Sequence, residues 1–384
     1  MLKKIGLWIL GVVSVAVLVL IAVAVISAPE TPATDSPLQA WLQPGPYTVA
    51  EKEHPFLDQT RPMNPNRDFI GIPFRPLPAT IWYPEGATGS LPLLLYAHGF
   101  TSSRAETIHV VEHLASHGYV VVAPDFPLTS TNAPGGPNVN DVSNQPEDLS
   151  FVIDSMLALE QKPFTGELDP ERIGIMGLSL GGFTTSLTVY HPRLRDPRVR
   201  AAISMAGPSA NLTGQFYAIS GVTIPFLMIA GTSDLLIDYA SNAAVIPERV
   251  TNGELLTIEG GNHIGFVTMA EPLLRLMHNS DTLACVAVQS NIEGEEEEQF
   301  ADLFSAELGI VLDPDAPGLC EQEPMPEAGH PGRQHMITQI GVLSFFESVF
   351  ASDPGRRREA RDVLVRHLPA EFAEANFRSA TVAQ

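Results

Sequence analysis

Three residues of the sequence could together carry out acyl transfer, the chemistry of a serine nucleophile working with a general base. Ser179 is the candidate nucleophile, His263 the candidate base and Asp234 the candidate acid. A serine hydroxyl is a weak nucleophile at neutral pH, so it needs a base within hydrogen-bond reach and a third group that orients this base. His263 would accept the hydroxyl proton, and Asp234 would hold the imidazole in the required tautomer and stabilise the imidazolium.

Ser179 is the centre of a G-x-S-x-G pattern at residues 177–181. A bare match of this kind often arises by chance, and the alternative reading is a glycine-rich turn with a solvent-facing serine. The flanking residues favour the nucleophile, because an apolar run at 173–176 predicts a buried strand and residues 183–190 predict a helix. In such a context the glycines permit a close backbone approach, and a strained turn lifts the hydroxyl beside the helix N-terminus.

The candidate acid and base each follow a predicted strand. Residues 223–230 form an apolar run whose exit carries Asp234, and residues 254–258 form another whose exit carries His263. Mostly parallel sheets bind ligands at the carboxyl ends of their strands, so we expect the three catalytic side chains to share that edge. Asp238 is the alternative acid, although its simpler interpretation is a surface carboxylate.

Two backbone amides are the expected donors of an oxyanion hole, which stabilises the negative oxygen that forms during acyl transfer. One is the amide of Leu180, directly after the nucleophile. The other is the amide of Phe100, in the loop that follows a predicted strand at 91–97. His98 precedes this amide, and we interpret His98 as a structural residue that is hydrogen-bonded within the loop.

Strand and helix signals alternate along most of the 384 residues, which predicts an α/β fold: a mostly parallel sheet with helices on both faces. Strands are predicted at 79–83, 91–97, 119–123, 173–176, 199–205, 223–230 and 254–258. Helices are predicted at 104–117, 147–161, 183–190 and 334–350, with terminal helical turns at 359–377. A long polar loop is predicted at 128–145, where such a length is usually functional or mobile.

The alternation divides the chain into a core at 47–268, an insertion at 269–333 and C-terminal helices at 334–384 that complete the core. The insertion contains Cys285, Cys320 and an acidic run at 293–298. In an exported protein two cysteines of one segment are expected to form a disulfide. The insertion starts beside the candidate base, so it could cover the site as a lid or be an inert outgrowth.

The N-terminus predicts export. Lys3 and Lys4 precede an uncharged apolar run that is long enough to span a membrane, so residues 1–28 are expected to be a signal anchor or, alternatively, a cleaved signal peptide. Either places the rest of the chain outside the cytoplasm. Residues 29–46, rich in Pro, Thr and Ser, are expected to be a tether.

Composition limits the partners of the chain. A formal net charge of −22 argues against nucleic acid and against an electrostatic hold on anionic lipid. His109, His113 and His117 are spaced by four and could suggest a metal stripe, but no carboxylate or cysteine at ligand spacing accompanies them. We therefore interpret them as a solvated helix face and predict no metal and no cofactor.

The sequence resembles the α/β-hydrolase superfamily over 47–269 and the helix from 334. The resemblance rests on residues 81–84, 96–100, 118–125 and 148–154 and on the order serine, acid, histidine. More closely, it is similar to a dienelactone-hydrolase-like branch that holds platelet-activating-factor acetylhydrolases and cutinase-like polyester hydrolases. Members often carry histidine where this chain has Leu178, a departure that weakens any transfer of substrate.

This resemblance implies a carboxylic-ester hydrolase that uses an acyl-enzyme and acts on a small-molecule or lipid ester. One alternative keeps the fold but changes the bond that is hydrolysed, as in a phospholipase A2-like enzyme or a peptidase. A peptidase would be expected to show an acidic clamp or a propeller domain, and neither is visible. The other alternative is an anchored binding protein without activity, but such proteins typically lack a triad member and this sequence has all three.

Overall fold

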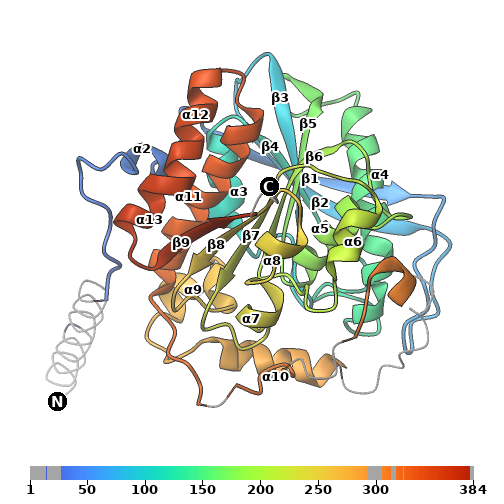
Figure 1. Ribbon diagram of the computed structural model, residues 1–384. Helices are drawn as coiled ribbons and strands as arrows, with labels where there is room; N and C mark the ends of the chain where they lie inside the picture. Colours follow the sequence, from blue (N-terminus) through green and yellow to red (C-terminus); the bar gives the residue numbers. More distant parts are fainter. Residues whose placement is uncertain (1–13, 15–26, 293–304, 313–316, 323, 381–384) are drawn as a thin grey trace, which may run out of the picture.

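A mostly parallel sheet organises the computed structural model, which describes residue 14 and residues 27–292, 305–312, 317–322 and 324–380 (Figure 1). Within these residues the strand order is β1-β2-β4-β3-β5-β6-β7-β8-β9. The strands from β4 to β8 in this order are parallel, whereas β1, β2 and β9 join antiparallel. Their bounds are β1 Val49–Asp58, β2 Arg75–Pro84, β3 Ser90–Ala97, β4 Val120–Pro124, β5 Glu167–Leu178, β6 Val199–Met205, β7 Phe226–Gly231, β8 Gly253–Ile258 and β9 Ala375–Ser379.

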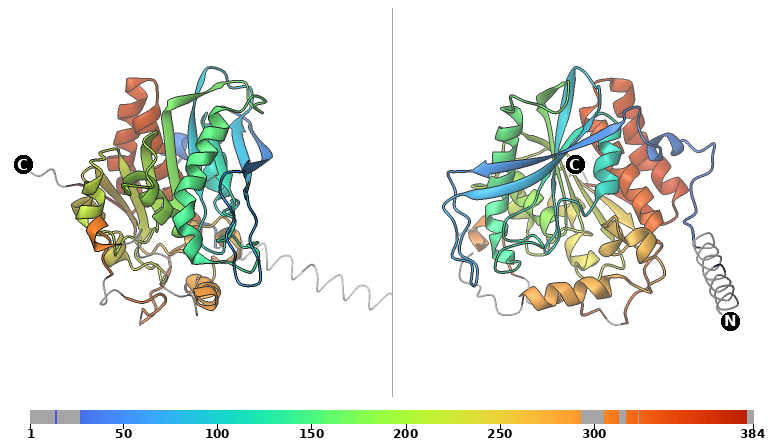
Figure 2. Two further views of the ribbon diagram at one scale, coloured as in Figure 1. Left: turned by 90° about the vertical axis from the view of Figure 1, so that its right-hand side faces the viewer. Right: turned by 180° about the vertical axis from the view of Figure 1, so that it is seen from behind.

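Helices cover both faces of the sheet (Figure 2). The longer ones are α3 Ile108–Ser116, α4 Gln145–Leu157, α5 Leu180–Tyr190, α10 Asp281–Ile292, α11 Pro331–Phe350 and α12 Pro354–Asp362. The shorter ones are α2 Gln39–Leu42, α6 Gly214–Ile219, α7 Tyr239–Asn242, α8 Ile246–Arg249, α9 Ala270–Leu273 and α13 Leu368–Glu371. Short helical segments of other types are the 3-10 helices η1 Val139–Asn144, η2 Ile264–Phe266 and η4 Ala306–Leu308 and the π-helical η5 Val363–His367.

The central strands are apolar throughout because both of their faces are buried. Leu93 and Leu95 of β3 enter the core beneath α4, α6 and α8, and Leu94 and Tyr96 enter the core beneath α3, α11 and α12. All four side chains are completely buried. This alternation confirms the predicted mostly parallel sheet with a helical layer on each face.

Several elements differ from their predicted extents. Helix α3 begins only at Ile108, and the predicted polar loop contains η1. The C-terminal segment expected to be purely helical also supplies the edge strand β9, which pairs with β8. The expected tether is packed where α2 forms, since Leu38 and Trp41 are buried in the core. The Arg356 guanidinium lies over the Trp41 ring, 3.7 Å from its centroid.

Two expectations fall outside the described residues and stay predictions. These are the signal anchor, of which only residues 14, 27 and 28 are described, and the acidic run at 293–298. Across the described part of the chain, no helix is both long enough and apolar enough to cross a membrane.

The insertion packs on the carboxyl end of the sheet, where α10 lies across it (Figure 1). A disulfide joins Cys285 of α10 to Cys320, with their Cα atoms 6.0 Å apart. Cys285 is buried against Leu235 and Leu236, which follow β7. The predicted disulfide is therefore present, and it attaches the insertion to a loop of the core.

Candidate active site

Ser179 lies in a sharp turn between β5 and α5, at the carboxyl end of the sheet. Its φ of 56° places a non-glycine residue in the left-handed region, a strained conformation often found at functional sites. Gly181 is required next to it, because a Cβ there would approach the Ala97 carbonyl oxygen to 2.0 Å. The Ser179 amide donates to the Met205 carbonyl of the neighbouring strand at 2.8 Å, which holds the turn against the sheet.

The structure brings Asp234 and His263 together from the loops after two neighbouring parallel strands, β7 and β8. His263 Nδ1 lies 2.8 Å from Asp234 Oδ2, and both side chains are buried. The other oxygen, Asp234 Oδ1, accepts the amides of Leu236 and Ile237 at 2.9 and 2.8 Å. These donors orient the carboxylate and keep it available to the imidazole.

Asp238, the alternative acid, is engaged elsewhere. It is the N-cap of α7, and its Oδ1 accepts the Ser241 amide at 2.8 Å and the Ser241 hydroxyl at 2.6 Å. This capping role gives Asp238 a local structural function.

The two residues whose amides are expected to form an oxyanion hole, Phe100 and Leu180, lie at the same cavity as Ser179. Phe100 and Leu180 line one cavity together with Ser179 and His263. Within the described residues, neither amide donates a backbone hydrogen bond.

This cavity has a volume of about 420 Å³ and mostly apolar walls. One wall comes from Leu236 and Ile237 after β7, and another from Ala284, Ala287 and Val288 of α10. The predicted insertion thus contributes directly to the space next to Ser179. Such walls suit an apolar group of a bound molecule.

Charged neighbours control the protonation of His263. Burial by itself lowers the pKa of this imidazole, but the carboxylates of Asp234, Asp281 and Glu106 outweigh burial and raise the pKa to about 8. With Asp234 at Nδ1, the neutral ring carries its proton there and keeps Nε2 as an acceptor.

Two of these carboxylates were not identified from the sequence. Glu106 lines the cavity, and its Oε1 accepts the Gly99 amide at 2.8 Å and the Tyr96 hydroxyl at 2.5 Å. Burial raises the pKa of Glu106 to about 7 despite these donors. Asp281, the first residue of α10, accepts hydrogen bonds from backbone amides of the loop that carries Asp234 and of His263. No local motif indicates that either residue lies at the site, since Glu106 precedes a helix and Asp281 lies in the insertion.

The histidines near the site have structural roles. His98 is fully buried, its Nδ1 lies 2.8 Å from the Gly99 carbonyl oxygen and its Nε2 accepts the Phe126 amide, which confirms the structural interpretation. The predicted solvated face of α3 is wrong, because His113 is buried and His109 stacks on His335 at 3.9 Å. Burial lowers the pKa of His113 and of His335 to about 4.

A metal centre is not assembled by these side chains. In the ranges that the structure describes, no group of three or more His, Cys, Asp and Glu side chains is placed to hold a metal ion.

Comparison with known proteins gives a family match over residues 77–277, described as PET hydrolase-like. Cutinase 1 of Thermobifida cellulosilytica is 26% identical over 188 residues, which are 48% of this chain and 64% of that protein. A cutinase of Thermobifida fusca (strain YX) is also 26% identical, over 48% of this chain and 56% of its own length. The putative esterase YitV of Bacillus subtilis (strain 168) is 28% identical over 37% of this chain and 53% of its own. The chain thus spans less than two thirds of the length of these curated relatives.

Proposed function

The chain belongs to the PET hydrolase-like family, and we propose that it is a serine carboxylic-ester hydrolase that works through an acyl-enzyme intermediate. The observation that carries the proposal is one mostly apolar cavity that Ser179, His263, Phe100 and Leu180 line together, with Asp234 hydrogen-bonded to the far nitrogen of His263. Relatives named as cutinases and as a putative esterase support the same reaction class.

In the proposed mechanism, Ser179 Oγ attacks the ester carbonyl carbon while His263 Nε2 takes the hydroxyl proton. The carbonyl oxygen becomes an oxyanion held by the amides of Phe100 and Leu180. His263 then returns the proton to the leaving alcohol, and the acyl group stays on Ser179. Water, deprotonated by the same nitrogen, releases the acid and restores the serine.

The role of Asp234 in this cycle is electrostatic and orienting. Its Oδ2 accepts a hydrogen bond from Nδ1–H, which fixes the neutral tautomer, and its charge stabilises the imidazolium that forms at each proton transfer. Apart from the attacking water, all of these steps use groups of the chain itself, so the proposal needs no cofactor.

We infer the substrate class from the cavity walls. Their apolar side chains favour an ester whose acyl or alcohol part is itself apolar, either a small molecule or a lipid. The Cys285–Cys320 disulfide indicates an oxidising compartment, so we propose that the catalytic part acts outside the cytoplasm.

A substrate screen tests this function. Purified protein is given p-nitrophenyl esters of increasing chain length, a phospholipid and a polyester film, and the released product is measured. Hydrolysis of the simple esters is the expected result. Turnover confined to the phospholipid would favour the phospholipase A2-like alternative, and turnover of none would contradict the proposal.

The pH dependence of the reaction follows from His263. Its neutral form is the base, so kcat/KM should rise with pH and reach half of its plateau near pH 8, where the imidazole loses its proton. Below that pH the rate should fall about tenfold per pH unit. The measurement is kcat/KM for one p-nitrophenyl ester across this range, with the stability of the protein checked at each pH. A rate that does not change between about pH 6 and 9 would remove His263 as the base.

Asp234→Asn should reduce kcat strongly, by up to about 10⁴-fold, because an amide can hold the wrong imidazole tautomer. Asp238→Asn is the matched control and should change kcat less than about threefold, since Asp238 caps α7. Steady-state kinetics of both variants checks the assignment of the acid. The assignment fails if the Asp238 variant is the crippled one.

A further inference from the structure

We propose that Asp281 of the insertion is a positioning residue that fixes the catalytic base and acid loops to each other. This inference rests on the proposed ester hydrolysis, because it assigns a role within that same site. It goes beyond the family resemblance, since the family match ends at residue 277 and leaves Asp281 outside.

The contacts of Asp281 are to backbone amides of both loops. Its Oδ2 accepts the amide of Leu235, directly after the candidate acid, at 3.0 Å, and the amide of His263 itself at 2.9 Å. Its Oδ1 accepts the amide of Ile264 at 2.8 Å. One side chain thus bridges the residue after Asp234 and the backbone of the base. A carboxylate is suited to this because it accepts on both oxygens, and hydrogen bonds to a charged acceptor are the strong ones.

Burial makes the loss of these hydrogen bonds costly. The Asp281 side chain is completely buried, so water cannot easily take the place of its carboxylate as the acceptor of the Leu235 and His263 amides, whose hydrogen bonds to it are also buried. Removing the carboxylate would leave buried N–H groups unpaired, which costs more than the loss of an exposed hydrogen bond.

Neighbouring residues of the insertion hold Asp281 in place. Asn279 Oδ1 accepts the Asp281 amide at 3.0 Å, and Asn279 Nδ2 donates to the Ser233 carbonyl at 2.9 Å. On the other side of the loop, the Cys320 amide donates to the Leu235 carbonyl at 2.8 Å. Because the disulfide joins Cys320 to Cys285 of α10, the helix that carries Asp281 is attached to the acid loop at two places.

The charge of Asp281 also acts on His263. The charged or titratable groups that face this imidazole are Asp234 after β7, Asp281 of α10 and Glu106 before α3, and all three stabilise the protonated ring. Asp281 itself is raised in pKa to about 6, by burial and then by Asp234, so it is ionised at the pH where His263 works as a base. The imidazolium formed in catalysis therefore faces a second carboxylate in addition to its partner.

Two variants test the bridge. Asp281→Asn keeps the shape of the side chain but removes its charge and replaces one accepting oxygen by an NH2 donor, so at least one of the three amides loses its acceptor. The midpoint of the acidic limb of kcat/KM should then move down by about one pH unit, and the plateau of kcat should fall about tenfold. Asp281→Ala should lower kcat further and reduce thermal stability, because it leaves the three amides unpaired. Asp238→Asn is the control for a nearby carboxylate and should leave the midpoint in place.

The outcomes distinguish this inference from the proposed function. If the wild-type protein hydrolyses esters and a fluorophosphonate probe labels Ser179, but Asp281→Asn keeps the wild-type midpoint, the positioning role is overturned and the hydrolase stands. If the wild-type protein has no activity and takes no label, the proposed function itself fails.

A measurement on the wild-type protein tests the bridge even if an Asp281 variant does not fold. In a pH titration of backbone amide resonances, Leu235, His263 and Ile264 should share an inflection near pH 6, where the carboxyl they contact gains its proton, in addition to any inflection near pH 8 caused by the His263 ring. Absence of a shared inflection near pH 6 would overturn the bridge.

Discussion

Ser179→Ala should lower ester hydrolysis by about 10³-fold or more while leaving the fold intact. Alanine removes only the hydroxyl, and the strained backbone at φ 56° is held by the Met205 carbonyl and by the close glycines rather than by the side chain. His263→Ala should cause a similar loss, because nucleophile and base act as a unit. Steady-state kinetics and circular dichroism of both variants provide the measurement.

Labelling by a fluorophosphonate probe is the second readout of the nucleophile. Mass spectrometry should find the label on Ser179 in the wild-type protein and find no label in Ser179→Ala. Ser103→Ala serves as the control, since Ser103 lies in the same region of the site but does not line the cavity, and it should keep both activity and label. Robust turnover by Ser179→Ala, or a label on another serine, would refute the assignment.

The parts that could be predicted from the sequence are those fixed by local constraints. The strand predicted at 199–205 coincides with β6, because its mostly apolar residues at 201–205 are buried in the centre of the sheet. The turn around Ser179 was predicted because glycines at fixed positions and a following helix are written into a few adjacent residues.

The parts that could not be predicted depend on contacts between distant segments. Asp281 meets the loop after β7 and the loop after β8 only once the insertion has folded across the sheet. Edge strand β9 has five residues and an exposed face, so its pairing with β8 gives no strong periodicity. The histidines of α3 look solvated in sequence, yet the ring of His335 in α11 stacks on His109.

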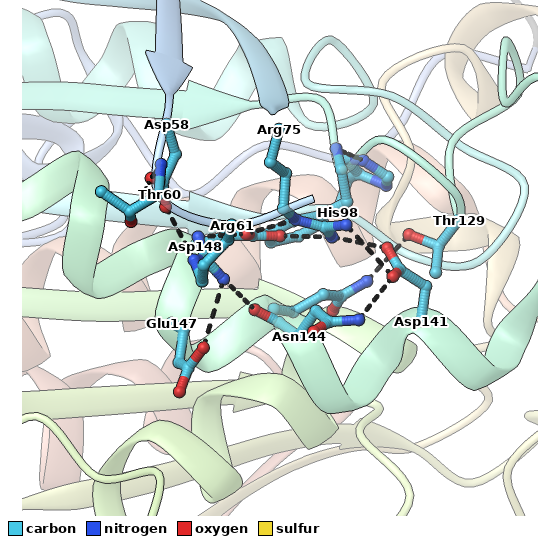
Figure 3. Close-up of polar contacts among 12 residues, drawn as sticks. Asp58, Thr60, Arg61, Arg75, His98, Thr129, Asp141, Asn144, Glu147 and Asp148 are labelled. Carbon is cyan, nitrogen blue, oxygen red and sulfur yellow. Dashed lines mark hydrogen bonds and ion pairs between the residues drawn. The ribbon is translucent and has the colours of Figure 1, made fainter. Parts of the chain in front are cut away.

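A buried ion network is another feature that sequence periodicity does not reveal (Figure 3). Arg75, at the start of β2, is completely buried between Asp148 of α4 and Asp141 of η1. Its Nε and Nη2 lie 2.6 and 2.7 Å from the two oxygens of Asp148, and its Nη1 lies 3.2 Å from Asp141 Oδ1. Arg61 Nη2 adds a further contact to Asp148 at 2.7 Å.

This network supports α4 and the polar loop before it, which contact α5. Gln145, the first residue of α4, donates to the Thr129 hydroxyl at 2.8 Å and accepts the hydroxyl of Thr184 in α5. Arg75 thus fixes the polar loop and α4 in the position from which they contact α5. The predicted long loop is ordered here by charge pairing, which explains why its polar sequence can lie against the core.

Arg75→Met should lower the free energy of unfolding by about 3–5 kcal/mol, because it fills the space of the side-chain stem but leaves buried carboxylates without their partner. Burial already raises the pKa of Asp141 beside Arg75, which shows how poorly this position accepts an unpaired charge. Arg200→Met is the matched control. The Arg200–Glu171 pair is exposed, with side chains 39% and 75% accessible, and its loss should cost less than about 1 kcal/mol. Urea unfolding followed by circular dichroism gives both values, and equal losses for the two variants would contradict the structural role of Arg75.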